Sequence, residues 1–392
     1  MSKLGIAARR CVAAVAIASV CLPQPCLAQV TLDNTALSEG DNEIGGGKAT
    51  WLNSVLDMYG VTGDTLSTDE DLSVNFWGGN SLDKFTITDD ANVTVNFEGD
   101  NEVEDIEAYD HSNVTVNMNE HNEFEDLEAK DNASLEVRVD GETSCESIKG
   151  YDDAQINVHG VNCPRKDVIE VGEDESSECV GTEKGDLTVK DVTLVMHSKE
   201  AEVSSKEGNV RIECTKIEGG EGNERVDAYA GGTMFVGGSV VDIAGSVHSN
   251  GELTLRRSDV DVTKAKGDES PYRVWSKTGI ELIEERNGTV KKGSADGSEV
   301  YYVDTDDDDA VHLDASLQPC YYRTCDDDKD SKSESVAQST VDTSCAVRAA
   351  RKIESVLPVT ADTSSYAGMI PAAVLGVTAI VAGVWRRRRS LS

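Results

Sequence analysis

The chain is poor in aromatic and basic residues. Phe, Trp and Tyr make up only 5% of its 392 residues, which is low for a large helical core. Lys and Arg total 36 against 73 Asp and Glu, so the formal net charge at pH 7 is −37. A polyanion repels phosphate backbones, and we therefore predict no nucleic-acid partner. The hydrophobic fraction of 38% is nevertheless too high for a wholly disordered acidic chain.

Residues 71–154 contain four consecutive units of a 21-residue repeat, without an insertion. The segment NVTVN at 92–96, for example, recurs at 113–117. Apolar residues at alternate positions predict short strands whose side chains point inward. The expected inward positions include Leu72, Val93, Val114 and Leu135; Val74, Val95, Val116 and Val137; Phe76, Phe97, Met118 and Val139; Leu82, Val103, Phe124 and Cys145; and Phe85, Ile106, Leu127 and Ile148.

A repeat of this length with two or three short strands is typical of one coil of a β-solenoid. We predict an all-β fold, a parallel β-helix that the crossover rule makes right-handed. Its regular coils cover 71–154 and its irregular coils 155–303. A leucine-rich repeat does not fit, because the units have no LxxLxL pattern. Residues 29–70 are expected to cap the first coil, with an amphipathic helix over 49–60.

Three asparagines recur at one position of the repeat. Asn80, Asn101 and Asn122 lie between the two apolar runs of successive units, where a turn is expected. Equivalent residues of stacked coils lie about 4.8 Å apart, so side-chain amides can bond from coil to coil. We therefore predict an asparagine ladder at this turn.

One outward face of the repeat is neutral and rich in hydrogen-bonding groups. Thr94 and Thr115 lie beside Asn96 and Asn117 in successive units. These four residues are our candidates for a ligand face that binds carbohydrate. A simpler explanation is that threonine forms strands well and asparagine keeps the surface soluble.

The other outward face is acidic. Stacked carboxylates repel each other by roughly 1 kcal/mol per pair even in water, and salt screens part of this repulsion. A solvated face tolerates such repulsion, but ordered acids also suit Ca²⁺. Our candidate calcium ligands are Glu104, Asp105, Glu107, Glu125, Asp126 and Glu128.

The motifs of common catalytic sites are missing. The chain contains no GHG segment of the polysaccharide-hydrolase type, although Asp89–Asp90 and Asp152–Asp153 are paired acids. No CxxC pair occurs, and the six histidines are scattered, which disfavours zinc. We expect no catalysis. The alternative is a β-helical polysaccharide lyase or glycoside hydrolase, because a fold alone does not define an activity.

The N-terminus has the pattern of a secretory signal peptide. Lys3, Arg9 and Arg10 precede the apolar run 11–22, and QPCLAQ follows it. This pattern predicts cleavage between Ala28 and Gln29, so that residues 1–28 are removed.

The C-terminus combines a short motif, an apolar span and a basic tail. The motif Leu357, Pro358, Val359, Thr360 and Ala361 precedes an uncharged stretch at 366–385. As a helix this stretch would span roughly 30 Å, one bilayer core. Four arginines follow at 386–389 and favour a cytoplasmic end.

This order resembles the sortase sorting signal of Gram-positive surface proteins. The resemblance covers 357–392 and departs from the family's LPxTG motif at Ala361. It implies that a sortase cuts after Thr360 and joins the chain to cell-wall peptidoglycan. Residues 304–356, rich in Asp and Ser, would be the stalk that links the solenoid to this signal.

Seven cysteines remain after signal removal, and an exported protein permits disulfides. Because seven is odd, at least one thiol stays free or pairs with another molecule. A loop at 163–179 is a candidate for closure by a disulfide. The disulfide candidates are Cys145, Cys163, Cys179, Cys214, Cys320 and Cys325.

Together these patterns predict a secreted, wall-anchored surface protein that acts as an adhesin or binds glycans. In architecture it resembles bacterial carbohydrate-binding β-helix proteins, which implies a glycan or host-surface ligand. Besides the enzymatic alternative, a structural surface spacer remains open.

Overall fold

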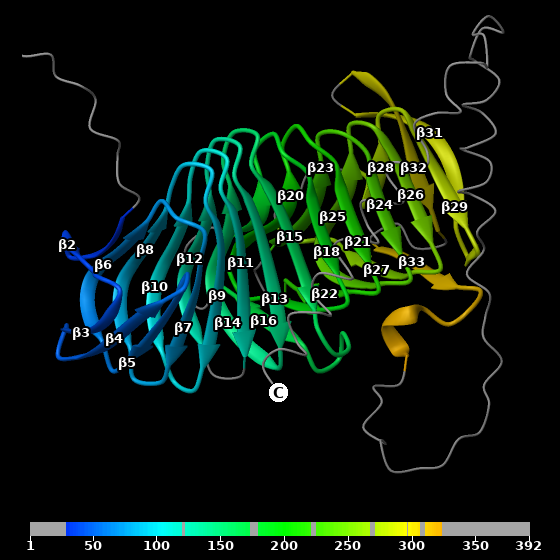
Figure 1. Ribbon diagram of the computed structural model, residues 1–392. Coiled ribbons are helices and arrows are strands. Elements are labelled where there is room, and N and C mark those ends of the chain that lie inside the picture. Colours follow the sequence, from blue (N-terminus) through cyan, green and yellow to red (C-terminus); the bar gives the residue numbers. More distant parts are fainter. Residues whose placement is uncertain are drawn as a thin grey trace, which may run out of the picture. The chain divides into compact units, whose positions relative to one another are not determined.

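The computed structural model describes residues 29–119, 122–172, 179–220, 225–266, 271–295, 297–305 and 310–323. All of them belong to one compact unit, Met1–Asp327. Apart from a single 3-10 turn at Cys320–Tyr322, their regular structure is β-strand. The strands form a β-solenoid whose coils stack one behind another (Figure 1). The predicted all-β solenoid is therefore confirmed.

Two large sheets run the length of the solenoid. The first sheet has 13 strands and carries the neutral face. Its parallel part starts at β5 and ends at β29, and β3 and β4 extend it in antiparallel fashion at the N-terminal end. Its strands are β3 (Gly40–Ile44), β4 (Gly47–Leu52), β5 (Val55–Tyr59), β7 (Leu72–Trp77), β9 (Asn92–Glu98), β11 (Asn113–Asn119), β13 (Ser134–Asp140), β15 (Gln155–Gly160), β18 (Leu187–Lys190), β21 (Val210–Glu213), β24 (Met234–Gly237), β26 (Glu252–Arg256) and β29 (Gly279–Ile283).

The second sheet has 20 strands and divides after β14 into two branches, which meet again at β25. Before the division lie β1 (Val30–Leu32), β2 (Thr35–Ala36), β6 (Thr62–Thr68), β8 (Ser81–Ile87), β10 (Glu102–Ala108), β12 (Glu123–Ala129) and β14 (Glu142–Gly150). One branch contains β16 (Val168–Val171), β19 (Thr193–Met196) and β22 (Lys216–Gly219), and the other β17 (Cys179–Thr182), β20 (Glu200–Ser205) and β23 (Arg225–Ala230). The remaining strands are β25 (Val240–Ser249), β27 (Asp259–Thr263), β28 (Val274–Ser276), β30 (Glu285–Arg286), β31 (Thr289–Ala295), β32 (Ser298–Asp304) and β33 (Ala310–Ala315).

In the regular coils, paired residues of neighbouring strands are 21 residues apart, as the repeat predicts. Val93 pairs with Val114, and Val114 pairs with Leu135 in the next coil. The expected inward residues are buried: Val116 and Leu127 are 0% exposed, and the rings of Phe76 and Phe97 stack with centroids 5.0 Å apart. Burying these ladders supplies most of the driving force for folding, at about 25 cal/mol per Å² of apolar surface.

Turn residues repeat with the same period. The predicted asparagine ladder is confirmed for its first pair, where Nδ2 of Asn80 donates to Oδ1 of Asn101 over 2.8 Å. Asn122 is also buried, but its Oδ1 has no partner among the described residues.

Each regular unit also closes on an aspartate in the left-handed region. The φ values of Asp89, Asp110 and Asp131 are 61°, 59° and 62°. Aspartate tolerates this conformation better than most residues, which explains why it returns at this position.

The helix expected over 49–60 is wrong. These residues form β4 and β5, an antiparallel hairpin whose two turn residues, Asn53 and Ser54, both have positive φ. Two such residues form the type I′ turn that joins paired strands. The hairpin buries Leu56 and Met58 and covers the first coil in place of a helix.

Beyond β15 the coils become unequal in length. Ile156 pairs with Leu187, and Leu187 pairs with Val210, so the spacing departs from 21 residues. Parallel pairing ends at β29. The hairpin β31–β32 and strand β33, which pairs antiparallel with β27, then cover the C-terminal end.

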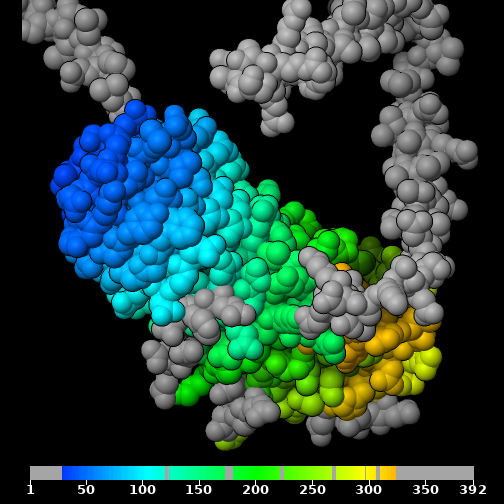
Figure 2. All heavy atoms as spheres, turned by 60° about the horizontal axis from the view of Figure 1, so that its bottom comes forward, coloured from blue at the N-terminus to red at the C-terminus, as the bar shows by residue number. Residues whose placement is uncertain are grey.

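The predicted start of the stalk at residue 304 is wrong, because residues 310–323 are part of the fold. Figure 2 shows this orange segment lying against the green coils. A disulfide between Cys214 and Cys320 holds it there, and Arg323 lies 3.0 Å from Asp191.

The other cysteines are partly placed. Cys163 is disulfide-bonded, and the side chain of Cys145 is buried in the core. The side chain of Cys179 and all of Cys325 lie outside the described residues, as do residues 324–356 of the predicted linker.

Candidate functional site

The predicted ligand face lies on the first sheet, and its amides form a continuous ladder. Thr94 pairs with Thr115, and Nδ2 of Asn117 donates to Oδ1 of Asn96 over 2.7 Å. Asn96 donates in turn to Asn75 over 2.8 Å, and Asn75 donates to Asp57 over 2.8 Å. The structure thus brings the four predicted residues together. One N–H of each amide in the ladder is already hydrogen-bonded within the protein, so the ladder holds neighbouring coils together whether or not a ligand binds.

Two aromatic rings lie beside the start of this ladder. Tyr59 on β5 and Trp77 on β7 are 46% and 42% exposed, and their ring planes differ by 8°. Their centroids are 6.1 Å apart, so the parallel rings are displaced sideways and overlap little. Part of each aromatic face is therefore open to solvent. We call Tyr59 and Trp77 the aromatic platform.

Asp57 orients the platform. Its Oδ1 accepts a hydrogen bond from Nε1 of Trp77 over 2.9 Å as well as the bond from Asn75. The indole is held in place before any ligand arrives, which lowers the entropy cost of binding. The platform therefore combines a fixed apolar surface with a carboxylate and a row of amides and hydroxyls.

The repeat pattern of the sequence does not predict the aromatic platform. Tyr59 lies before the regular repeat, and Trp77 stands where the next coil has Glu98. The signal that could have revealed it is the single departure of Trp77 from an otherwise polar outward row. In a chain with only four tryptophans, such an exposed position is conspicuous.

On the acidic face, three lysines form ion pairs with the carboxylates. The ammonium nitrogen of Lys84 lies 3.3 Å from Asp105 and 3.2 Å from Glu107. Lys130 binds both Glu107 and Glu128. Lys149 lies 3.6 Å from Asp126. Four of the six predicted calcium ligands are thus already paired with a cation of the chain, and only Glu104 and Glu125 have no ion pair within the described region.

The pKa shifts follow this pattern. Burial raises the pKa of Glu107, but hydrogen bonds from Lys130, Tyr109 and Lys84 outweigh burial and hold it below its usual value. At Glu104, desolvation and then the charges of Glu125 and neighbouring acids raise the pKa. The ionised form of Glu107 is therefore stabilised in the folded protein, whereas the ionised form of Glu104 is disfavoured.

Among the described residues, no group of three or more His, Cys, Asp or Glu side chains is arranged to hold a metal ion. The predicted acids lie along a sheet face, and Glu107 and Glu128 share Lys130 rather than an open centre. The predicted calcium site stays a prediction.

Two acids on neighbouring coils line a hollow of about 490 Å³. Glu218 on β22 and Asp242 on β25 are register partners, and His197 also lines the hollow. The backbones of neighbouring strands lie about 4.8 Å apart. A retaining glycosidase holds its two carboxyl groups about 5–5.5 Å apart, so acids on neighbouring strands suit this spacing. The paired acids noted in the sequence, Asp89–Asp90 and Asp152–Asp153, lie elsewhere, at the turns that close the coils.

The predicted processing signals lie at the border of the described region or outside it. Gln29 is the first described residue, and its backbone N–H donates to Asp69 over 2.7 Å. Ala28, the sorting motif at 357–361 and the span at 366–385 lie outside. Within the described segments, no helix is long and apolar enough to cross a membrane.

Comparison of the chain with protein-family models, with curated proteins and with solved structures returns no match.

Proposed function

We propose that the protein is a non-catalytic, glycan-binding surface protein, exported and anchored to the cell wall by a sortase. Its solenoid is right-handed, as the crossover rule favours. The aromatic platform on the first sheet binds neutral sugar residues and so attaches the cell to a glycan-bearing surface, as an adhesin does.

The observation that supports this function best is the exposed, oriented pair Tyr59 and Trp77. A pyranose ring presents C–H groups on its faces and hydroxyls around its rim. The C–H face packs on an aromatic face, and the hydroxyls bond to nearby acceptors and amides. Asp57, Asn75 and the rows that continue to Thr94 and Asn96 provide such groups at the edge of the platform.

A glycan array, followed by calorimetry with the best neutral oligosaccharide, tests this function. Trp77→Ala should weaken binding about tenfold or more, because truncating a central aromatic anchor costs over 1 kcal/mol. Leu52→Ala is the matched control, since Leu52 is exposed on the same sheet at 57% but lies away from the rings. A protein that binds no glycan would leave the role of a structural spacer. A Trp77→Ala variant with unchanged affinity would remove the platform as the binding site.

A second candidate function is glycoside hydrolysis at Glu218 and Asp242. It is favoured by the placement of two register-paired acids at the hollow with His197. Release of reducing ends from a polysaccharide, abolished by Asp242→Asn, would establish this activity. No release from any substrate that the array identifies would exclude it for those glycans.

A further inference from the structure

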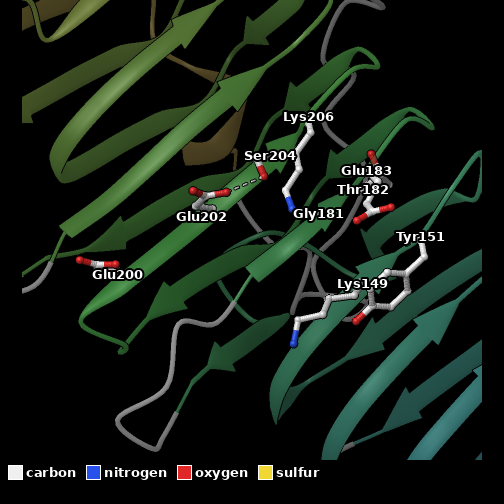
Figure 3. A pocket seen from close by; sticks show the side chains of 10 residues that line it. Lys149, Tyr151, Gly181, Thr182, Glu183, Glu200, Glu202, Ser204 and Lys206 are labelled. Atoms are coloured by element: carbon white, nitrogen blue, oxygen red, sulfur yellow. Dashed lines mark hydrogen bonds between the residues drawn. The ribbon is translucent and has the colours of Figure 1, made fainter.

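A second hollow lies on the branch of the second sheet that contains β17 and β20, and it has a different chemistry. Its volume is about 400 Å³, and Figure 3 shows the side chains that surround it. Lys149, Gly181 and Ser204 are register partners on three successive coils and form its centre. We call this hollow the lysine cleft.

The cleft exists because one coil contributes no side chain. Gly181 stands between Lys149 and Ser204 in the row. A Cβ at Gly181 would lie 2.6 Å from the backbone carbonyl oxygen of Ser204, so no larger residue fits. The stem of Lys149 and the ring of Tyr151 thus face an opening about one coil wide, large enough for one sugar unit.

Lys206 brings a second lysine side chain to the cleft, beside Lys149. Its side chain bends back over Ser204, with the ammonium group drawn beside Gly181 (Figure 3). Among the described residues Lys206 has no ion pair, although acids outnumber bases two to one in this chain. The hydroxyl of Ser204 donates to Oε2 of Glu202 over 3.1 Å, and Glu200 and Glu183 lie at the rim. The cleft therefore offers one available positive charge surrounded by hydrogen-bond acceptors.

We propose that the lysine cleft binds a saccharide unit that carries a single carboxylate. The ammonium group of Lys206 pairs with the carboxylate, and the rim carboxylates of Glu200 and Glu202 accept hydrogen bonds from the sugar hydroxyls. The net charge of −37 repels a long polyanion, so one isolated carboxylate on an otherwise neutral glycan suits the site. Such a unit is a terminal sialic acid or a single uronate. The site takes a different ligand from the aromatic platform, so either proposal can fail alone.

Calorimetry of the full secreted chain tests this proposal with two matched pairs of probes. The first pair is 3′-sialyllactose with lactose, and the second is cellobiouronic acid with cellobiose. We expect at least one acid to bind more tightly than its neutral partner, and the pair that does so identifies the source of the carboxylate. Lys206→Gln should reduce that affinity about tenfold, since a charge-assisted bond is lost.

Lys277→Gln is the matched control. Lys277 is equally exposed and has no ion pair within the described segments, but it lies outside the cleft. Trp77→Ala should leave binding of the acid unchanged, which separates this site from the platform. Equal affinity for both members of each pair would overturn the proposal, as would equal effects of Lys206→Gln and Lys277→Gln.

Discussion

The ammonium nitrogen of Lys130 lies 2.7 Å from Oε1 of Glu107, which belongs to the preceding coil. Lys130 also binds Glu128 and lies 5.0 Å from the ring centre of Tyr109. One lysine therefore joins two coils where the sequence places carboxylates in register. This contact explains how the solenoid tolerates a stack of like charges.

Replacing Lys130 by Gln should destabilise the protein. The side chains of Glu107 and Glu128 are only 10% and 14% exposed, and removing Lys130 leaves Glu107 with Lys84 alone and removes the cation bound to Glu128. We expect a loss of about 2–4 kcal/mol in the free energy of unfolding at pH 7. Urea denaturation measures this loss. Lys48→Gln, at an exposed ion pair with Asp41, should have a much smaller effect, because water and salt screen an exposed pair.

The same pair predicts a pH dependence. The pKa of Glu107 is lowered in the folded protein, so its stabilisation is present above the unfolded pKa and is lost as pH falls through the folded pKa. The difference between the wild type and Lys130→Gln should therefore shrink below about pH 4. A difference that stays constant down to pH 3 would contradict this account.

Glu285 should affect the pH dependence of stability in the opposite sense to Glu107. Burial raises its pKa to about 7, and its Oε2 has no partner among the described residues, while Oε1 accepts from the backbone of Ser258 over 2.8 Å. A raised carboxyl pKa costs stability as pH rises from the unfolded value through the folded one. Glu285→Gln should therefore raise the melting temperature at pH 8 and leave it nearly unchanged at pH 4. Equal effects at both pH values would refute a titrating role.

The register predicts a contrast between adjacent residues. Val116 is 0% exposed, whereas Thr115 points outward on the same strand. Val116→Asp should cost several kcal/mol, because an unpaired charge enters the core. Thr115→Asp should cost well under half as much. Thermal melts of both variants measure the contrast, and equal losses would contradict the register.

Calcium provides a test of the acidic face. Lys84, Lys130 and Lys149 pair with four of the six acids, so the predicted calcium site depends on Glu104 and Glu125, and calcium should raise the melting temperature more than sodium at equal ionic strength. A specific site at a hundredfold excess of calcium over Kd would add about 2.7 kcal/mol. A rise specific to calcium, abolished by Glu104→Gln with Glu125→Gln, would establish the metal site.

Anchoring is tested at Thr360. Thr360→Ala should move the protein from the cell-wall fraction to the membrane or the medium, because the residue at the expected cleavage point is lost. Fractionation followed by immunoblotting measures this. Ser364→Ala, four residues further on, is the control and should remain in the wall fraction. Wall attachment that survives Thr360→Ala would remove the sortase hypothesis.

The sequence predicted the regular coils well because their period is strict. Val93, Val114 and Leu135 recur without an insertion, and the strands pair in that register. The hairpin at β4 and β5 was missed because its short apolar run fits either a helix or a strand. Only the backbone at Asn53 and Ser54 decides between them.

The sites depend on contacts that a repeat does not encode. Trp77 and Tyr59 lie side by side on the neighbouring strands β7 and β5. The contact between Lys130 and Glu107 depends on the rotamers of both side chains. The disulfide partner of Cys214 is Cys320, 106 residues away, and several pairings of the cysteines were equally compatible with the sequence.

The bond between Cys214 and Cys320 also determines where mechanical tension enters the molecule. If the chain is held at its C-terminus while a glycan pulls on the platform, the load reaches Cys320 first. It then crosses directly to Cys214, at the turn after β21, and bypasses the intervening chain, a sequence separation of 106. The last coils and their antiparallel cap thus carry no tension along their backbone and cannot be peeled away strand by strand. A reducing environment would remove this connection, and the C-terminal end of the solenoid would then be the first part to unfold under such a load.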